Sequence, residues 1–441
     1  MFLRLWYIVL QTWVLAVVMT LLFLSQRYWY RRAEKFANRR SPTLRWLIRG
    51  ALILSLVLII LAVLNGFLGR HRPLKHNSTL AEAAGFWMAS SLASYALIQA
   101  VHLGDWLWRR ARSLFARGAK SQPRDSAAAS ELANPSRRYL LQTASLAAGA
   151  APFLAFGYGF ADERWRFQLL ASELPIANLP PALDGMRIVQ LSDIHASSFM
   201  PIAQVRRAVG MANELNADLA VVTGDFITGP GDPIEECIAE LSQLRAPLGV
   251  WGCNGNHEIY ANAEALAAEL FRKNGMTLLR QEQSVLRWNG ESLNLIGVDY
   301  QRQRAASGEK LVMLQGVEQL VRRGMPNILL SHNPNSFPRA AELGIEVSLA
   351  GHTHGGQVKV EILDHSLSPA TLITPYIAGL YRRPLGAPSA ASDAELRASA
   401  AKRAPSPSAL IYVNRGLGMI GAPVRLGVPP EITLHTLRRA T

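Results

Sequence analysis

Cysteine is scarce in this sequence, because only Cys237 and Cys253 occur among its 441 residues. Two cysteines cannot form the framework of several disulfides that holds small secreted domains together, although a single bond between them stays open in an oxidising compartment. The chain is long enough to bury a large core instead. Its stability is therefore expected to come from packing.

Acidic residues are also in short supply, with 32 Asp and Glu against 46 Lys and Arg and a net charge of +14. Such an excess is typical of nucleic-acid-binding proteins. Much of it, however, lies between long apolar runs, where positive charge sets the orientation of membrane helices. The sequence also lacks the strip of alternating basic and aromatic residues that single strands need. No nucleic-acid partner is expected.

Long apolar runs occupy the first 160 residues. A helix needs about 20 apolar residues to span a bilayer, so three of the runs qualify well and the last one marginally. None has an ionisable residue at its centre, which argues against an ion path. We predict that residues 1–160 form an all-α transmembrane region in the lipid bilayer with about four helices, at residues 3–24, 51–68, 83–107 and 140–158.

The basic residues between these runs predict the topology. Eight lie between the first and second runs, eight between the third and fourth, and only three between the second and third. Because cytoplasmic loops carry the excess of Lys and Arg, the two eight-charge loops should be cytoplasmic. This predicts a multi-pass protein of the bacterial inner membrane, with the domain at 161–441 on the periplasmic or extracellular side.

The segment Ser136–Gln142 has two interpretations. Arg137 and Arg138 precede a weakly hydrophobic run, as in a twin-arginine signal anchor for export of folded domains. They are equally compatible with two ordinary cytoplasmic arginines. Both interpretations place the following domain outside. The preceding residues, 117–135, are rich in Ala, Ser and Arg and are expected to be a flexible linker.

From Met186 onward, short apolar runs alternate with amphipathic segments, which predicts an α/β domain. Helices are expected at 202–215, 233–244, 261–273 and 310–323. Polar clusters follow five of the apolar strands. Each cluster alone is compatible with a polar turn or a structural histidine, but five in order point to a site where the carboxyl ends of the strands meet. The residues are Asp193, His195, Asp225, Asn256, His257, His332, His352 and His354.

The stretch from Leu349 to Gln357 is the strongest of these clusters. Strand alternation would place His352 and His354 on the same side of an extended segment, and the glycines that follow allow a sharp turn. Two divalent ions can clamp the attacking and leaving oxygens of a phosphoester. Such a pair needs a bridging carboxylate, for which Asp225 is the candidate, and a neutral oxygen donor, which the amide of Asn256 can supply. Ligands of this kind without cysteine suit Mn, Fe or Zn.

The motifs Asp-x-His, Gly-Asp, Gly-Asn-His-Glu, a later His and Gly-His-Thr-His together resemble the calcineurin-like metallophosphoesterases, and the branch of membrane-associated bacterial phosphoesterases in particular. The resemblance covers Met186 to the C-terminus and implies a four-layer αββα sandwich. It implies two divalent metal ions, with Asp225 bridging them. One ion would take Asp193, His195 and His354, and the other Asn256, His332 and His352.

The resemblance further implies in-line attack by metal-bound hydroxide, with His257 as the catalytic histidine. The expected function is hydrolysis of a phosphomonoester, phosphodiester or pyrophosphate, with lipid-linked phosphoesters among the substrates. The alternative is a membrane sensor or transport-associated protein that uses the fold as a non-catalytic binding module. Residues 380–408 are richer in Ala, Pro and Ser than the family pattern, and we interpret them as a low-complexity insertion.

Overall fold

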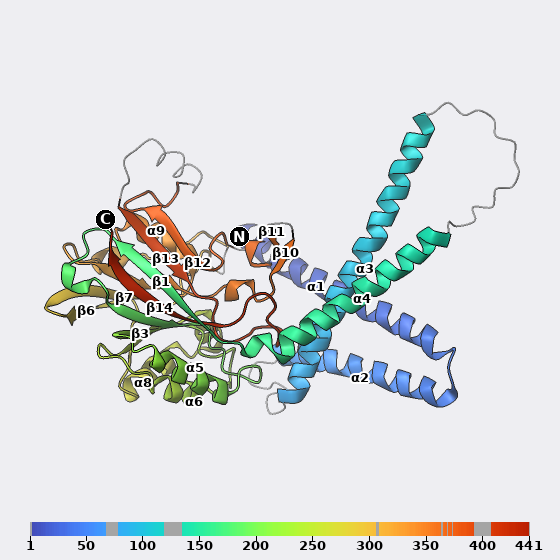
Figure 1. The fold of residues 1–441 in the computed structure, drawn as a ribbon, viewed down its shortest axis with the longest axis horizontal. Helices are drawn as coiled ribbons and strands as arrows, with labels where there is room; N and C mark the ends of the chain where they lie inside the picture. Colours follow the sequence, from blue (N-terminus) through green and yellow to red (C-terminus); the bar gives the residue numbers. More distant parts are fainter. Residues whose placement is uncertain are drawn as a thin grey trace, which may run out of the picture.

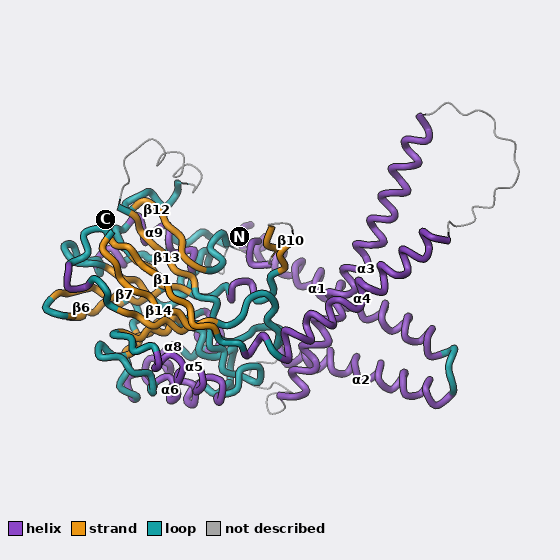
Figure 2. The backbone as a smooth tube through the Cα atoms, in the orientation of Figure 1, coloured by secondary structure: helices purple, strands orange, loops and turns teal. Residues whose placement is uncertain are grey.

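The computed structural model describes residues 2–67, 78–118, 135–305, 308–362, 365–367, 369–372, 374–391 and 407–440. Four long helices form one end of the molecule and a two-sheet domain forms the other (Figures 1 and 2). The linker predicted at 117–135 and the loop between the second and third helices lie almost wholly outside the described residues.

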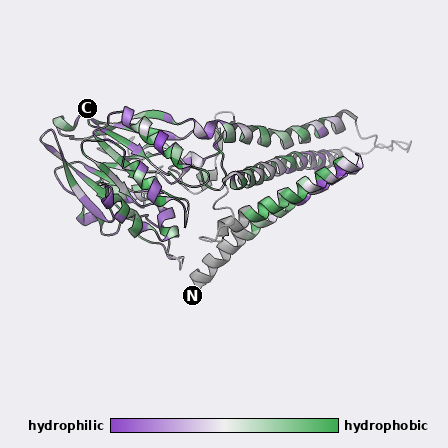
Figure 3. Cartoon of the chain, turned by 90° about the horizontal axis from the view of Figure 1, so that it is seen from below, coloured by the Kyte–Doolittle hydropathy of each residue, from purple (hydrophilic) through white to green (hydrophobic). Residues whose placement is uncertain are grey.

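The helices are α1 (Phe2–Ala37), α2 (Pro42–Phe67), α3 (Ser78–Gly118) and α4 (Pro135–Ala161). Each contains one of the predicted apolar runs, and apolar residues cover long stretches of them (Figure 3). Among the described residues, the segments Pro42–Leu61 and Tyr139–Trp165 are long and apolar enough to cross a membrane. The run in α3 is less hydrophobic, because it contains serines, glycines, His102 and Asp105.

Serine side chains hold the helices together. The Ser25 hydroxyl of α1 and the Trp29 indole donate hydrogen bonds to the Ser91 carbonyl of α3, both at 3.0 Å. The Ser94 hydroxyl of α3 donates to the Gly149 carbonyl of α4 at 2.8 Å. Small side chains let helices approach closely, and hydrogen bonds of this kind are common between helices that associate in lipid.

The C-terminal domain contains two mixed sheets of six strands. The first sheet has the order β1 (Gln168–Ile176), β14 (Glu431–Arg439), β2 (Arg187–Leu191), β3 (Leu219–Thr223), β4 (Val250–Cys253) and β5 (Thr277–Leu278). The second has the order β12 (Gly379–Pro384), β13 (Ser408–Val413), β9 (Val347–Ala350), β8 (Asn327–Leu330), β7 (Glu291–Gly297) and β6 (Glu282–Trp288). A separate hairpin pairs β10 (Val360–Ile362) with β11 (His365–Leu367).

Strands β2, β3, β4 and β5 run parallel to one another, and so do β7, β8, β9 and β13. Alternation along each strand forms a core on both faces. In β3, Leu219 and Val221 pack between the sheets, whereas Ala220 and Val222 face the helices. The strands are therefore buried on both sides, which explains their continuous apolar sequences.

Helices cover the outer face of the first sheet: α5 (Ile202–Glu214), α6 (Ile234–Leu241), α7 (Asn256–Ala261) and α8 (Glu264–Lys273). The second sheet has a thinner cover, consisting of α9 (Phe337–Glu342) and the segments packed beside it. The four-layer αββα arrangement implied by the resemblance is confirmed. The predicted helix at 310–323 is wrong, because only the short 3-10 turn Val317–Gln319 forms there, between Gly316 and Gly324 at φ of +84° and +85°.

Two further predictions are tested by the domain. Residues 380–384, assigned to the low-complexity insertion, instead form most of the edge strand β12. Residues 392–406 lie outside the described part of the chain, so for them the insertion stays a prediction. Cys237 and Cys253 are both buried and free, so they form no disulfide.

The helical region contacts the domain through two loops of the sandwich. Phe199, which follows the β2 strand, packs against Ala81 and Ala84 of α3. A Cβ atom on Gly85 of α3 would lie 2.8 Å from Cδ of Pro423, which shows how closely α3 approaches the loop before β14. The domain is thus packed directly on the ends of the helices.

A second contact lies at the end of α4. A Cβ atom on Gly159 would lie 2.3 Å from the Arg425 carbonyl oxygen. Arg164, just beyond the helix, forms a bidentate ion pair with Glu82 of α3 at 3.3 Å for each bond, and its guanidinium stacks on Phe160. These contacts fix the direction in which the chain enters the sandwich.

Candidate metal centre

All eight predicted site residues converge at one end of the two-sheet core. Those from the first sheet follow β2, β3 and β4, and those from the second follow β8 and β9. Because the parallel strands in each sheet end at the same edge, residues far apart in sequence meet there. The side chains are buried or nearly so: Asp193, His195, Asp225, Asn256, His257, His332, His352 and His354.

The backbone at the site has an unusual conformation. Asp193, His195 and Asp225 have φ of +48°, +48° and +56°, and His352 and His354 have φ of +77° and +52°. Such values are costly for residues with a side chain and cluster at functional sites. The expectation that His352 and His354 follow strand alternation is wrong, because β9 ends at Ala350 and the backbone turns at both histidines.

As a result, the two histidines join different groups. In the first group, ligand atoms of Asp193, His195 and His354 lie within 4.8 Å of one another. The Nε2 atoms of His195 and His354 face each other at 3.1 Å, and His354 Nε2 lies 3.4 Å from Asp193 Oδ1. Two imidazoles and a carboxylate thus point at one small volume.

Asp225, His332 and His352 form the second group, again within 4.8 Å. Asp225 Oδ2 lies 3.0 Å from His332 Nε2 and 3.5 Å from His195 Nε2, so this carboxylate stands between the two groups. His332 Nδ1 lies 2.6 Å from the Thr223 carbonyl oxygen. A carbonyl can only accept, so Nδ1 carries the proton and Nε2 faces the site.

A buried polar atom supports a metal as the missing partner. Oδ1 of Asn256 has no hydrogen-bond partner among the described residues. A buried amide oxygen without a partner is costly unless something else binds it. Carboxylate, imidazole and amide oxygen are the ligands that suit a hydrolytic Mn, Fe or Zn site, so the residues fit divalent ions.

His257 lies beside both groups. Its imidazole is 4.6 Å from that of His195 between ring centroids, and its backbone N–H donates to Asp225 Oδ1 at 2.9 Å. The Nδ1–H of His257 donates to the Thr228 carbonyl at 2.6 Å. This bond fixes the ring and leaves Nε2 free to exchange a proton within the site.

Burial and neighbouring charge set the protonation of the site. Burial lowers the pKa of both His195 and His352 to about 3, so these imidazoles are neutral, as metal ligands must be. Burial would raise the pKa of Asp225, but the charge and hydrogen bond of His332 hold it well below its usual range. Burial would lower the pKa of His332, but the carboxylates of Asp225 and Asp193 raise it to about 10, so this imidazole has to release a proton in order to bind a metal ion. Burial raises the pKa of Asp193 to about 6. The site thus holds an ionised carboxylate at its centre.

Sequence reasoning missed the part played by Glu258. Its carboxylate accepts hydrogen bonds from the backbone N–H groups of Asp225, Phe226 and Gly255 at 2.9, 2.8 and 2.8 Å. It therefore holds the loops after β3 and β4 together. Its position three residues after the Gly255 N-cap is that of the glutamate in a capping box, a signal available in the sequence.

The segment before β14 also supports the site. The Leu417 N–H donates to the Ser192 carbonyl at 3.0 Å, and the Gly418 N–H donates to the Asp193 carbonyl at 2.7 Å. A Cβ atom on Gly416 would lie 2.5 Å from Cβ of Asp193, so only glycine fits there. No local sequence pattern predicts this contact, because it joins residues more than 200 positions apart.

A two-sheet sandwich with these aspartate, histidine and asparagine side chains at its strand ends is the architecture of a metallophosphoesterase. The calcineurin-like phosphoesterase profile matches residues 186–356, and a probable calcineurin-like phosphoesterase transmembrane domain matches residues 8–164. The chain belongs to the calcineurin-like metallophosphoesterases, in the branch that carries a transmembrane domain. It is therefore a metal-dependent phosphoric ester hydrolase located in a membrane.

Three relatives illustrate the range of the family. The metallophosphoesterase YkuE of Bacillus subtilis is 30% identical over 69% of this chain and 98% of its own length. A transmembrane protein with metallophosphoesterase domain from Danio rerio is 28% identical over 64% of this chain and 60% of its own length. The UDP-2,3-diacylglucosamine pyrophosphatase LpxG of Chlamydia trachomatis is 27% identical over 58% of this chain and 86% of its own length.

Proposed function

We propose that the chain is a binuclear-metal phosphoesterase in which Asp225 bridges the two ions. Asp193, His195 and His354 would hold one ion, and Asn256, His332 and His352 the other. The observation that carries this proposal is the position of the Asp225 carboxylate between the two groups of ligand atoms. Bound there, the ions would supply Lewis acidity toward a phosphoryl group and lower the pKa of water.

The remaining side chains of the site would transfer a proton or hold the metal ligands in position. His257, held through Nδ1, would donate a proton from Nε2 to the leaving oxygen or stabilise charge on the phosphoryl oxygens. Tyr300, whose hydroxyl lies 3.4 Å from His352 Nε2, would orient that imidazole. Glu258 would keep Asp225 and Asn256 at a fixed separation, since it binds the loops that carry both.

The proposed substrates are phosphomonoesters, phosphodiesters or pyrophosphates, including lipid-linked ones. Support comes from the packing of the domain on the four helices and from a relative named UDP-2,3-diacylglucosamine pyrophosphatase.

The positions of the basic residues support a topology for the domain. The basic C-terminal ends of α1 and α3 lie at the end of the helices that is far from the sandwich (Figure 1). Because loops rich in Lys and Arg stay on the cytoplasmic side of the membrane, the domain at the opposite end would be periplasmic or extracellular. A reporter fused after Thr441 tests this, and reporter activity in the cytoplasm would reverse it.

The test of the activity uses the full chain in detergent. After chelation of metals, hydrolysis of bis-nitrophenyl phosphate, nitrophenyl phosphate and a lipid-linked pyrophosphate should stop, and it should return when Mn is added to two ions per chain. Return at one ion per chain would contradict the binuclear centre. If no substrate in this panel is cleaved at any loading, the chain is instead a non-catalytic sensor or transport-associated protein.

Exchange of Gly255 for alanine should disrupt the site. A Cβ atom there would lie 2.1 Å from Asp225 Oδ1 and 2.6 Å from its backbone nitrogen, so the carboxylate must move. Displacement of a reacting group by about 1 Å costs roughly 10²-fold in rate, and we expect a loss of that order. The control is Gly210→Ala in α5, where an added Cβ meets nothing within 4 Å. Equal activity of both variants would show that the loop tolerates the shift.

A further inference from the structure

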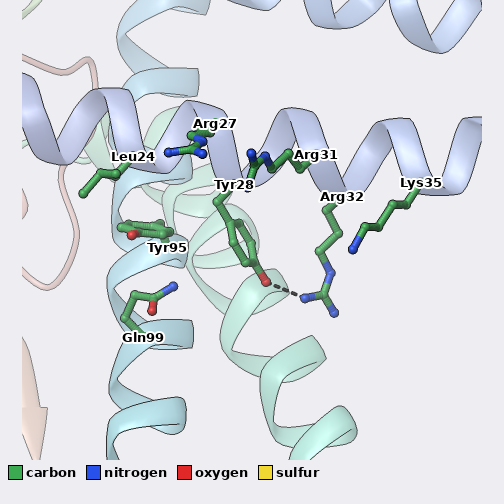
Figure 4. Close-up of a pocket in the computed structure, with 8 residues that line it drawn as sticks. All are labelled: Leu24, Arg27, Tyr28, Arg31, Arg32, Lys35, Tyr95 and Gln99. Atoms are coloured by element: carbon green, nitrogen blue, oxygen red, sulfur yellow. Dashed lines mark hydrogen bonds between the residues drawn. The ribbon is translucent and has the colours of Figure 1, made fainter.

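A cavity of about 520 Å³ lies between α1 and α3, well away from the sandwich. Figure 4 shows that one stripe of α1 and two residues of α3 line it. Tyr28, Arg32 and Lys35 extend from the side of α1 on which Tyr95 and Gln99 of α3 lie, and Arg27 and Arg31 lie across the α1 ribbon in this view (Figure 4). The lining residues are Leu24, Arg27, Tyr28, Arg31, Arg32, Lys35, Tyr95 and Gln99.

The cavity is cationic and contains no acidic lining residue. Arg27, Arg31 and Lys35 follow one another at intervals of four residues, an arrangement in which like charges repel. Within the described part of the chain, no carboxylate pairs with them. The nearby acids have other partners, because Glu34 pairs with Arg49 and Asp105 pairs with Arg109. The concentrated positive charge therefore lacks a counter-charge from the protein.

The lining of the cavity also changes from apolar to charged along its length. Leu24 lies at one end, where the apolar run of α1 finishes, and Lys35 lies eleven residues further, or about 16 Å along the helix axis. Tyr30, next to the charged stripe in sequence, is exposed, as aromatic residues are at the membrane–water boundary. The Tyr28 and Tyr95 rings lie 5.6 Å apart and form part of the wall. If α1 spans the bilayer up to Leu24, as its sequence predicts, the cavity would pass from acyl-chain depth to head-group depth.

The geometry points to a binding site for the phosphate head group of an anionic phospholipid, in the leaflet opposite the catalytic domain. The arginine and lysine side chains would bind the phosphate, Tyr28 and Gln99 would donate hydrogen bonds, and the first carbons of the acyl chains would lie against Leu24. A membrane lipid fits better than a soluble phosphate, because the cavity is apolar at the end that enters the bilayer. The site is separate from the metal centre and does not depend on its chemistry.

The test compares two variants with equal loss of charge. Arg31→Gln with Lys35→Gln removes two cavity cations, whereas Arg39→Gln with Arg40→Gln removes two cations just beyond the end of α1 that do not line the cavity. Both leave the same number of basic residues in this loop for membrane insertion. Phosphatidylglycerol and phosphatidylcholine are titrated against the full chain in detergent, and bound lipid is counted by native mass spectrometry.

Each basic residue at an anionic surface strengthens binding by about fivefold, so the cavity variant should bind phosphatidylglycerol about 25-fold more weakly and the control less than about twofold. Arg27→Gln alone should cost about fivefold, which keeps the test available if the double variant fails to fold. An unchanged unfolding temperature and elution volume in size-exclusion chromatography report folding of each variant. Equal weakening in both double variants, equal binding of phosphatidylcholine, or full competition by glycerol phosphate would each overturn the proposal.

Discussion

Asp225→Asn should lower phosphoester hydrolysis by at least about 10³-fold. A pair of ions contributes several kcal/mol to transition-state stabilisation, and each 1.36 kcal/mol is a factor of ten in rate. The Asp225 carboxylate lies between His195 and His332, so replacing it with a neutral amide would weaken both proposed metal positions together. Metal analysis of the purified full chain should show the loss of more than one ion, and hydrolysis of nitrophenyl substrates gives the rate.

The matched control is Asp184→Asn, an exposed aspartate whose carboxylate, among the described residues, accepts a hydrogen bond from the backbone N–H of Arg439. It should leave rate and metal content unchanged. The two variants separate loss of the site from a general effect of removing one acid. If Asp225→Asn retained one tightly bound ion and most of the rate, this carboxylate would be the ligand of a single metal and the bridging role would be lost.

His257→Gln should lower the rate by about 10²- to 10⁴-fold while both ions stay bound. A positioned proton donor contributes a factor of this size. The loss should be small for a nitrophenyl leaving group, which leaves without a proton, and large for an alkyl phosphoester, which needs one. Steady-state rates with the two substrates give the ratio. The competing role for His257 is that of a metal ligand, because its imidazole lies within ligand distance of His195 and Asp225.

Metal content distinguishes the two roles of His257. If it is a proton donor, the glutamine variant binds two ions with unchanged affinity and loses rate in proportion to the leaving-group pKa. If it is a ligand, the variant loses an ion and the two substrates are affected alike. The second outcome would contradict the proposed catalytic role and identify His257 as a metal ligand.

The sequence predicted which residues gather at the strand ends, and the reason is physical. Buried parallel strands are read from continuous apolar runs, and polar residues directly after them share one edge, so Asp193 and His332 could be placed together without knowing the strand order. The order itself was not predictable. Strand β14 pairs between β1 and β2, joining Thr433 to Gln190, and no local pattern encodes a pairing over that distance.

Two of the wrong predictions share a cause, which is that backbone conformation overrides periodicity. The helix expected at 310–323 has helical spacing of apolar residues, but Leu314 and Gly316 adopt positive φ and the segment folds as a loop. The same applies to His352 and His354, where positive φ replaces strand alternation. Strand β12 was missed because its sequence sits within a stretch whose composition is typical of disorder.

Arg425 connects the membrane contact to the site. Its buried guanidinium donates to the carbonyls of Arg415, Gly416 and Gly418, and its own carbonyl lies against Gly159 of α4. The metal-ligand cluster is thereby connected to the end of α4 by packed contacts, so that in a bilayer it would lie at a fixed distance from the membrane surface. A substrate confined to the same leaflet would reach it by a search in two dimensions, whereas a substrate free in solution would gain nothing from the arrangement.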